Sequence, residues 1–539
     1  MALLLLVAIH YRLGHELPDD AAFFLRYAEN MARGQFWVWN LGEAPVWGAS
    51  APLFPLLFVL PLKLGMAPIP AVLWTSILVG VVALTWAALL MRRYFGDAAA
   101  WVLVVFLCLD SGVMHFAGSG LETPLTFVLL VAALHVLLAR QQGKLCMPLS
   151  ESGCLGLGWD ARRKAQRYPA VSRAFATPQT AQSQDAPATT GLCRASRDVW
   201  LGVVAGLLAV QKLDLAPAAV LLLVVAAVQA RRIPWRALAA AACIAAAWYG
   251  FAWYWFGSPV PNSFLTKAFH QNQMIRQFGW NWFASAVFWK HGHWIFTILA
   301  LLGVRFCWRE YKPLLVFCLG CLGIHVLAYS IKYPFEAYDW YWMPAMFLLL
   351  WLAAVGACRV GAAIGARVPR VRWLPALTVA LLCGVIVAGL VPLERRETHE
   401  RKHWLDYGEY DRAQAGRWVA AHTPPWFKVD TCWGNPAVFS QRYVYDCSFL
   451  NRRVDITSDP QDMLEGYPNL TKLYRPEVAI FQSSSDTAQA NPPQVPGYEV
   501  VRVFTKTFDS GWHGYFFVVY VRDDVLKYVS DISLKTPAE

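Results

Sequence analysis

The stretch LPDDAAFFLRYA, residues 17–28, decides how the rest of the chain is interpreted. Its two adjacent carboxylates, Asp19 and Asp20, follow a short apolar run and precede a polar and aromatic segment. At the border of a membrane-embedded body, carboxylates are costly unless a reaction or an ion needs them. A structural alternative makes Asp19 a helix N-cap and Asp20 a first-turn acid favoured by the helix dipole. Both interpretations are open from this stretch alone.

The composition of the chain is that of a polytopic membrane protein. Of its 539 residues, 57% are hydrophobic and 15% are charged, whereas soluble domains average about 25% charged residues. The formal net charge of +11 does not require a nucleic-acid partner, because Lys and Arg concentrate in the cytoplasmic loops of membrane proteins. Neither a Walker loop nor a GxGxxG motif occurs, so the sequence offers no support for ATP hydrolysis or a dinucleotide fold.

Apolar stretches predict about eleven transmembrane helices, each needing about 20 residues to cross a bilayer. The first stretch is short and contains His10 and Arg12, so we expect a strained first helix or a natural start upstream of Met1. A cleaved signal peptide is the alternative for this stretch, although it lacks a basic start and a small-residue cleavage site. The expected spans are residues 1–13, 71–90, 101–116, 126–138, 200–210, 216–228, 237–255, 294–304, 313–330, 343–357 and 374–390.

Charged residues divide between the two sides of the membrane. The positive-inside rule assigns the basic segments to the cytoplasm: Arg92–Arg93, 141–198, Arg231–Arg232, Arg305 with Arg309, and 359–372. The same count then assigns the polar motifs to the outer side: Asp19 with Asp20, Glu122, Lys212 with Asp214, Asn262 with Lys267, and Tyr338 with Asp339. Because the count did not use these motifs, their convergence predicts one outward-facing active site.

The chain divides into two expected domains. Residues 1–393 form a transmembrane domain with an outer catalytic loop at 15–50 and a basic, mostly disordered cytoplasmic loop at 141–198. Residues 394–539 are expected to form a small periplasmic α/β domain, with a helix at 410–421 and strands at 498–504 and 515–522. Since the periplasm is oxidising, Cys432 and Cys447 are predicted to form a disulfide. We expect the protein in the bacterial inner membrane.

The polar motifs hold the groups that glycosyl transfer needs. A carboxylate takes the proton of the acceptor hydroxyl, cations hold the departing phosphate, and aromatic rings orient the sugar. Asp19 or Asp20 would be the base, and the two acids could also share a divalent cation such as Mg, Mn or Ca. The expected phosphate contacts are Arg26, Lys212 and Lys267, and the expected aromatic walls are Trp37, Trp39, Tyr338 and Trp340. Asp339 lies among these aromatics at a span boundary, which favours a functional role.

The other candidates have structural alternatives. Glu122 could be an acid in the first turn of a helix. Lys212 and Asp214 could pair with each other in a break between helices. Asn262 lies in a Pro-rich turn, and Lys267 could reach the outer headgroups from a helix.

The motifs resemble those of GT-C glycosyltransferases. The resemblance covers roughly residues 15–345 and rests on three blocks. These are LPDDA…FLRYA…VWN…SAPL at 17–53, SGLETPL at 119–125, and FGSPVPNS at 256–263 followed by Lys267. Within that group the chain is most similar to the mycobacterial arabinofuranosyltransferase that adds terminal β-(1→2) residues, and to its bacterial relatives. It departs from the group at Lys212-Leu213-Asp214, where an Arg-Pro-acid element is usual.

The resemblance implies a GT-C fold with a polyprenyl-phosphate sugar donor and a periplasmic acceptor. It also implies that Asp19 or Asp20 is the catalytic residue, supported by Glu122. The first hypothesis is therefore an inverting glycosyltransferase that moves a pentofuranose, with D-arabinofuranose as the first donor expected, to a periplasmic glycan or a glycoprotein such as pilin. A transporter or flippase of a lipid-linked saccharide is the alternative, although the chain shows no internal repeat. A scaffold that presents the soluble domain would have no use for the acids.

Overall fold

The computed structural model describes most of the chain. It covers residues 17–141, 186–266, 287–289, 292–308, 310–331, 339–368, 370–371, 373–432, 434–446, 451, 474–483, 492, 494–504 and 516–530. The expected first span, residues 1–13, lies outside these ranges, as do residues 142–185 of the expected cytoplasmic loop.

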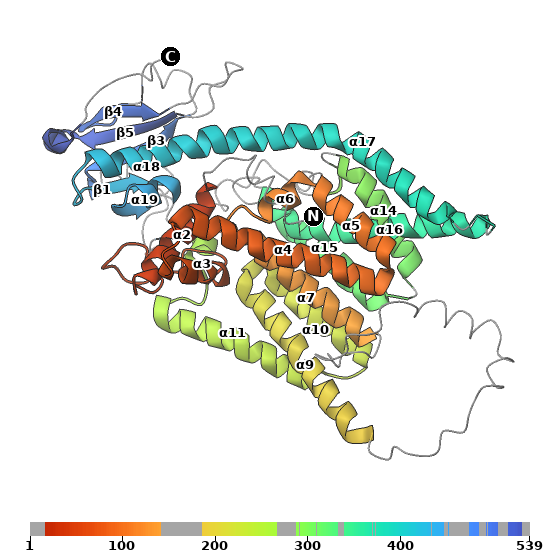
Figure 1. Cartoon of the computed structure of the whole chain (residues 1–539). Helices are drawn as coiled ribbons and strands as arrows, with labels where there is room; N and C mark the ends of the chain where they lie inside the picture. The colour runs from red at the N-terminus through yellow and green to blue at the C-terminus, as the bar shows by residue number, and fades with distance from the viewer. Residues whose placement is uncertain are drawn as a thin grey trace.

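The body of the molecule is a bundle of apolar helices (Figure 1). Its helices are α4 Pro68–Phe95, α5 Asp97–Leu109, α6 Ser111–Phe116, α7 Thr123–Gln141, α9 Ala186–Gln211, α10 Ala216–Ala230, α11 Trp235–Phe256, α14 His293–Cys307, α15 Lys312–Ile331, α16 Met343–Arg367 and α17 Leu374–His403. Seven helices of the described ranges are long and apolar enough to cross a membrane, and α5 and α14 are shorter apolar helices. Every expected span after the first corresponds to one helix of the bundle except 101–116, which is divided at Asp110 into α5 and α6. The long apolar helices confirm a polytopic helical membrane protein.

Helix α16 lies at the centre of the bundle. Nearly all of its residues from Met343 to Ala357 are buried, and it contacts α5, α7, α14, α15 and α17. Glycines allow its closest contact, since a Cβ added to Gly356 would lie 1.8 Å from the Leu299 carbonyl oxygen of α14. Small residues permit such approach of helix backbones inside a membrane.

Two short helices form the outer end of the bundle. Helix α2 (Asp19–Ala32) follows Pro18, and α3 (Leu53–Lys63) packs against it. Between the two helices, Trp37 and Trp39 are fully buried against the Tyr27 ring of α2. The loop at 15–50 therefore has a core of its own.

The C-terminal domain is joined to the bundle by α17, which continues without a break past the expected boundary at 393/394 (Figure 1). A π-helical segment, η4 Trp404–Glu409, leads into α18 (Tyr410–His422), and α19 (Gly434–Phe439) packs on α2. The sheet has the strand order β2-β1-β3-β5-β4, with β1 Lys428–Thr431, β2 Tyr443–Asp446, β3 Val478–Ser483, β4 Tyr498–Phe504 and β5 Phe516–Arg522. Strand β1 is parallel to β2 and β3, and β5 is antiparallel to β3 and β4. The predicted α/β domain is thus confirmed.

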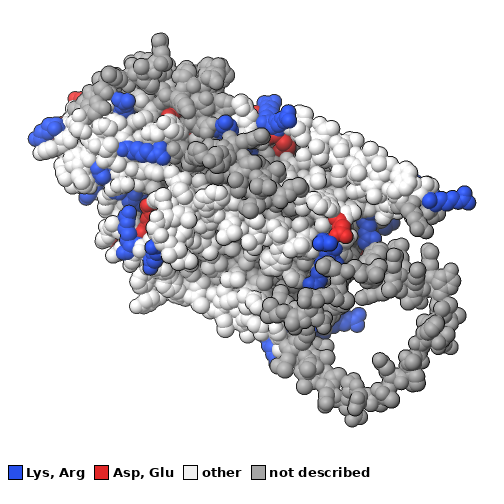
Figure 2. Space-filling model, viewed as in Figure 1, with Lys and Arg blue, Asp and Glu red and all other residues white. Residues whose placement is uncertain are grey.

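Charged side chains of both signs are unevenly distributed over the surface of the molecule. In Figure 2, Lys, Arg, Asp and Glu gather toward the two ends of the face in view, with a broad white surface between them. At the end away from the C-terminal domain, the buried Asp198 carboxylate bonds Arg140 at 2.8 Å and Arg232 at 2.7 Å. Helix α9 begins at Ala186 rather than at Trp200, so residues 186–198 are helical instead of part of the expected loop.

Candidate active site

Asp19 and Asp20 open helix α2 but have different surroundings. Asp19 is buried, and its two carboxylate oxygens accept hydrogen bonds from the backbone N–H groups of Gly434 and Asn435, both at 2.9 Å. Asp20 is partly exposed. Successive side chains of an α-helix project in directions about 100° apart. The Asp20 side chain therefore projects in a different direction from the Asp19 side chain, which contacts α19.

The C-terminal domain surrounds the Asp19 carboxylate. The Asn435 side chain donates to the Leu17 carbonyl at 2.9 Å and to Glu409 at 2.8 Å, and Glu409 pairs with Arg412 at 2.9 Å. Burial raises the pKa of Asp19, against the opposing influence of Arg412 and the two amides. Asp19 is therefore part of a buried network between the domain and the outer loop.

Arg26 lies at the same junction and is buried. Its guanidinium donates to the carbonyls of Trp39 and Arg442, to the Asn40 side chain at 2.9 Å, and to the Ala437 carbonyl. It also lies 4.7 Å from the centre of the Trp39 ring. Burial lowers the pKa of Arg26 to about 10. Arg26 and Trp39, which the sequence placed in a donor site, thus connect the outer loop to the C-terminal domain.

The loop before α7 brings Glu122 to the outer loop. Gly120 has a φ of +91°, and a Cβ there would lie 2.7 Å from Val72 and 3.0 Å from Ala21, next to Asp20. Glycine is needed both for the left-handed conformation and for the space. The structure therefore brings the motif at 119–125 into contact with the motif at 17–53. Glu122 lies two residues after Gly120.

Lys212 is the centre of a second cluster. It lies in the extended break between α9 and the 3₁₀ turn η1 (Leu213–Leu215), and its Nζ is 2.9 Å from Glu122 and 3.5 Å from Asp214. Its ammonium lies 5.2 Å from the centre of the Tyr341 ring, and the Tyr329 hydroxyl donates to Asp214. The alternative that Lys212 and Asp214 pair with each other is thus borne out, with Glu122 as a second partner.

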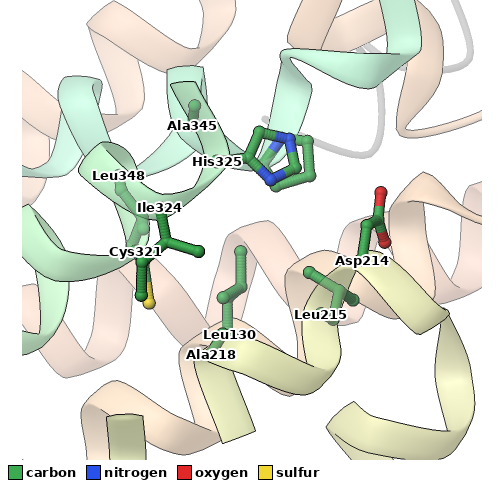
Figure 3. Close-up of a pocket in the computed structure, with 10 residues that line it drawn as sticks. Leu130, Asp214, Leu215, Ala218, Cys321, Ile324, His325, Ala345 and Leu348 are labelled. Carbon is green, nitrogen blue, oxygen red and sulfur yellow. The ribbon is translucent and has the colours of Figure 1, made fainter. Parts of the chain in front are cut away.

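A small cavity of about 20 Å³ adjoins this cluster. That volume accommodates about one water molecule. In Figure 3, Asp214 of η1 and His325 of α15 lie at one side of the cavity, and apolar side chains line much of the rest. The His325 Nε2 is 2.5 Å from the Tyr341 carbonyl oxygen.

The remaining candidates from the sequence fall in different places. The Asn262 N–H donates to the Trp47 carbonyl at 2.7 Å, which joins the third sequence block to the outer loop. The Trp340 ring is 6.1 Å from Phe116. Lys267 and Tyr338 lie outside the described residues, as does the side chain of Asp339. Cys432 is disulfide-bonded, but Cys447 lies outside the described residues, so their pairing stays a prediction.

The divalent ion expected between Asp19 and Asp20 stays a prediction, because each Asp19 oxygen accepts one backbone hydrogen bond and keeps a second lone pair. Within the described ranges, no group of three or more His, Cys, Asp or Glu residues is arranged to hold a metal ion.

Several polar residues were not predicted from the sequence. His325 and Tyr329 lie in an apolar helix, where an ionisable side chain is itself a signal. A third cluster joins α5, α14 and α17: Asp110 Oδ2 lies 3.5 Å from His293 Nε2, and Glu394 accepts the Ser111 N–H at 2.8 Å. His293 is buried.

Comparison with solved structures identifies the architecture. The chain is similar to the crystal structure of ArnT from Cupriavidus metallidurans bound to undecaprenyl phosphate. The two sequences are 14% identical, and the superposition covers 96% of each chain with a TM-score of 0.55. The apo state of that protein is 15% identical over 95% of this chain and 96% of that one, with a TM-score of 0.51. The Archaeoglobus fulgidus oligosaccharyltransferase tethered to an acceptor peptide is 10% identical over 95% of this chain and 73% of that one, with a TM-score of 0.50.

No family model and no curated protein sequence matches the chain. At these identities the structural likeness concerns the fold alone. The helical bundle and the C-terminal domain together show that this is a multi-pass membrane protein with the GT-C fold.

Proposed function

We propose that the protein is an inverting glycosyltransferase that moves a sugar from a polyprenyl phosphate to an acceptor outside the membrane. One observation carries the proposal. The contact of Gly120 with Ala21 connects the partly exposed Asp20 to the cluster of Glu122, Lys212 and Asp214. A carboxylate on α2 and a cation paired with Glu122 of the neighbouring loop are the groups that acceptor activation and phosphate departure require.

Asp20 is assigned as the base in this proposal, because Asp19 is buried and bonded to the C-terminal domain, whereas Asp20 is partly exposed. Its carboxylate takes the proton of the acceptor hydroxyl while that oxygen attacks the anomeric carbon. The bond from this carbon to the phosphate oxygen breaks, and the lipid phosphate leaves with the electron pair. The new bond forms on the opposite face of the sugar, so the configuration inverts.

Lys212 is assigned to the departing phosphate. An ammonium has three N–H donors, and Glu122 and Asp214 account for two of them. The third can bond a phosphate oxygen. Lys267 and Asp339 are retained as further donor contacts, whereas Arg26 is reassigned to holding the C-terminal domain on the outer loop.

Different observations support the class of the donor and the identities of its sugar and of the acceptor. The undecaprenyl phosphate bound to ArnT supports a polyprenyl-phosphate donor for this chain as well. The sequence resemblance supports D-arabinofuranose as the sugar and a periplasmic glycan or glycoprotein, such as pilin, as the acceptor. The bacterial inner membrane, with the active site in the periplasm, is the corresponding location.

A transporter or flippase of a lipid-linked saccharide is the second candidate. Asp214 and His325 lie in apolar membrane helices, and ionisable residues there also occur on transport pathways. The glycosyltransferase is preferred because Asp214 pairs with Lys212, whose other partner Glu122 lies two residues from the contact of Gly120 with α2.

The test compares wild-type protein with Asp20→Asn and Asp19→Asn in liposomes that contain a synthetic polyprenyl-phosphoryl arabinofuranose and an arabinan acceptor. Asp20→Asn is expected to lower the turnover about 10²- to 10⁴-fold, the usual contribution of a general base, with donor binding retained. Undiminished product from Asp20→Asn would contradict the assignment. Movement of the lipid sugar across the bilayer without product would favour the transporter, and a panel of donor sugars tests arabinose.

A further inference from the structure

The C-terminal domain contacts the outer loop directly at the residue next to the proposed base. We propose that Asn435 is a positioning residue for the transfer reaction: through the start of α19, the C-terminal domain fixes Asp19 and thereby sets the position of Asp20. The inference rests on the proposed function, since it takes Asp20 as the base.

Asn435 holds the start of α2 by two hydrogen bonds, and its neighbour Gly434 donates a third. Its backbone N–H donates to Asp19 at 2.9 Å, and its side-chain amide donates to the Leu17 carbonyl at 2.9 Å. The Gly434 N–H donates to the other Asp19 oxygen at 2.9 Å. Asn435 is completely buried. The residues on both sides of Pro18, through the Leu17 carbonyl and the Asp19 carboxylate, are therefore bonded to one residue of the C-terminal domain.

The fit at this contact is close. A Cβ added to Gly434 would lie 2.2 Å from the Asp19 carbonyl oxygen and 3.1 Å from the Phe23 backbone nitrogen. Both atoms belong to backbone, which cannot move aside as a flexible side chain can. The α19 backbone thus lies directly on the first turn of α2, and a shift of one moves the other.

The domain holds Asn435 from its other side. Glu409 accepts from the Asn435 side chain at 2.8 Å and pairs with Arg412 at 2.9 Å. Arg412 also donates to Gln482 of β3 at 3.1 Å and lies over the Phe517 ring of β5. A continuous set of contacts therefore runs from the sheet to Asp19.

This connection has a chemical consequence because Asp19 and Asp20 are consecutive residues. A displacement of about 1 Å in a reacting group can cost about 10²-fold in rate. Loss of the Asn435 contacts should therefore slow the chemical step more than it weakens donor binding, in which Asn435 takes no part.

Asn435→Ala has a matched control in Asn40→Ala. Asn40 also crosses between the outer loop and the domain, with bonds of 2.9 and 3.0 Å to the Val444 backbone, but it does not contact Asp19. We expect Asn435→Ala to lower kcat about 10- to 100-fold with the donor KM little changed. Asn40→Ala should lower the unfolding temperature comparably with a much smaller effect on kcat. An equal loss of kcat in both variants would overturn the proposal.

A double-variant measurement separates positioning from folding. Asn435→Ala keeps the backbone N–H that donates to Asp19 and removes only the side-chain bonds to the Leu17 carbonyl and Glu409. If these side-chain bonds act by positioning Asp19, adding Asn435→Ala to Asp19→Asn should reduce kcat little further, whereas independent effects would multiply. Hydrogen exchange gives a readout that needs no activity: amides at the start of α2 should exchange faster in Asn435→Ala than in Asn40→Ala. If wild type shows no transfer, the proposed function fails, and unchanged exchange at α2 would separately refute the positioning contact.

Discussion

At the scale of single residues, two adjacent acids differ because of partners far away in the chain. Asp19 is bound by backbone groups 415 and 416 residues later, while Asp20 keeps part of its surface exposed. The sequence alone does not show which of two adjacent carboxylates bonds residues far away in the chain. The difference in burial is therefore the main structural reason for assigning the chemistry to Asp20.

Lys212→Met tests the second cluster. The substitution leaves the Glu122 and Asp214 carboxylates buried without their cation, and breaking a buried ion pair typically costs about 3–5 kcal/mol of folding stability. We expect a lower unfolding temperature together with weaker donor binding, measured by thermal unfolding in detergent and by titration with the lipid phosphate.

The control for that experiment is the double variant Lys212→Met/Asp214→Asn. Removing one carboxylate reduces the uncompensated negative charge, so part of the lost stability should return. Donor binding should stay weak, because the cation is still missing. Recovery of both properties together would show that Lys212 is needed for folding alone.

At the scale of helices and strands, Arg26 of α2 donates two hydrogen bonds to the C-terminal domain, at Ala437 of α19 and at Arg442 just before β2, and two within the outer loop, at Trp39 and Asn40. Bonds to a charged group contribute about 1.5–3 kcal/mol each, so Arg26→Leu should destabilise the junction by several kcal/mol. Arg26→Lys should not restore it, because a lysine ammonium cannot reproduce the planar fork of guanidinium donors. Limited proteolysis should then release the C-terminal domain earlier than in wild type. A wild-type cleavage pattern in Arg26→Leu would show that the domain is held by other contacts.

The sequence predicted these elements well where one local rule decides the structure. Long apolar runs became α4, α16 and α17, and the β-branched run at 498–504 became β4 with the same bounds. The predictions from the sequence failed where contacts between distant parts of the chain determine the structure. The first residues of α9 have little apolar periodicity, and the ion pairs of the buried Asp198 in the middle of this helix depend on Arg140 of α7 and on Arg232 of the turn after α10.

The residues of the candidate site also divide into those that the sequence predicted and those that it did not. Glu122, Lys212 and Asp214 were found because charged residues beside apolar spans require a reason, and the structure brings all three together. Asn435 and Arg412 were missed, since an Asn and an Arg in a soluble domain carry no such signal. Arg26 was placed with the donor because its local motif did not reveal four acceptors in the folded protein.

At the scale of the whole molecule, the GT-C fold places the proposed site between a membrane bundle and a soluble domain. The bundle supplies Glu122, Lys212 and Asp214, and the outer loop supplies Asp20. The C-terminal domain contacts the outer loop through α19, while the basic residues Arg231 and Arg232 lie at the far end of α10. Such an arrangement suits a reaction between a lipid-held donor and a water-soluble acceptor, because each substrate can reach the site from its own phase.

The orientation of the molecule in the membrane follows from this arrangement and can be measured. Positive-inside counting places the turn between α4 and α5 in the cytoplasm and the C-terminal domain outside, and the disulfide at Cys432 suits an oxidising compartment. Ala98 and Lys527 are exposed at the two ends, so Ala98→Cys and Lys527→Cys are matched probes in a background without other reactive thiols. A membrane-impermeant maleimide should label Lys527→Cys in intact spheroplasts and Ala98→Cys only after permeabilisation. The reverse pattern would place the proposed site in the cytoplasm, where a periplasmic acceptor could not reach Asp20.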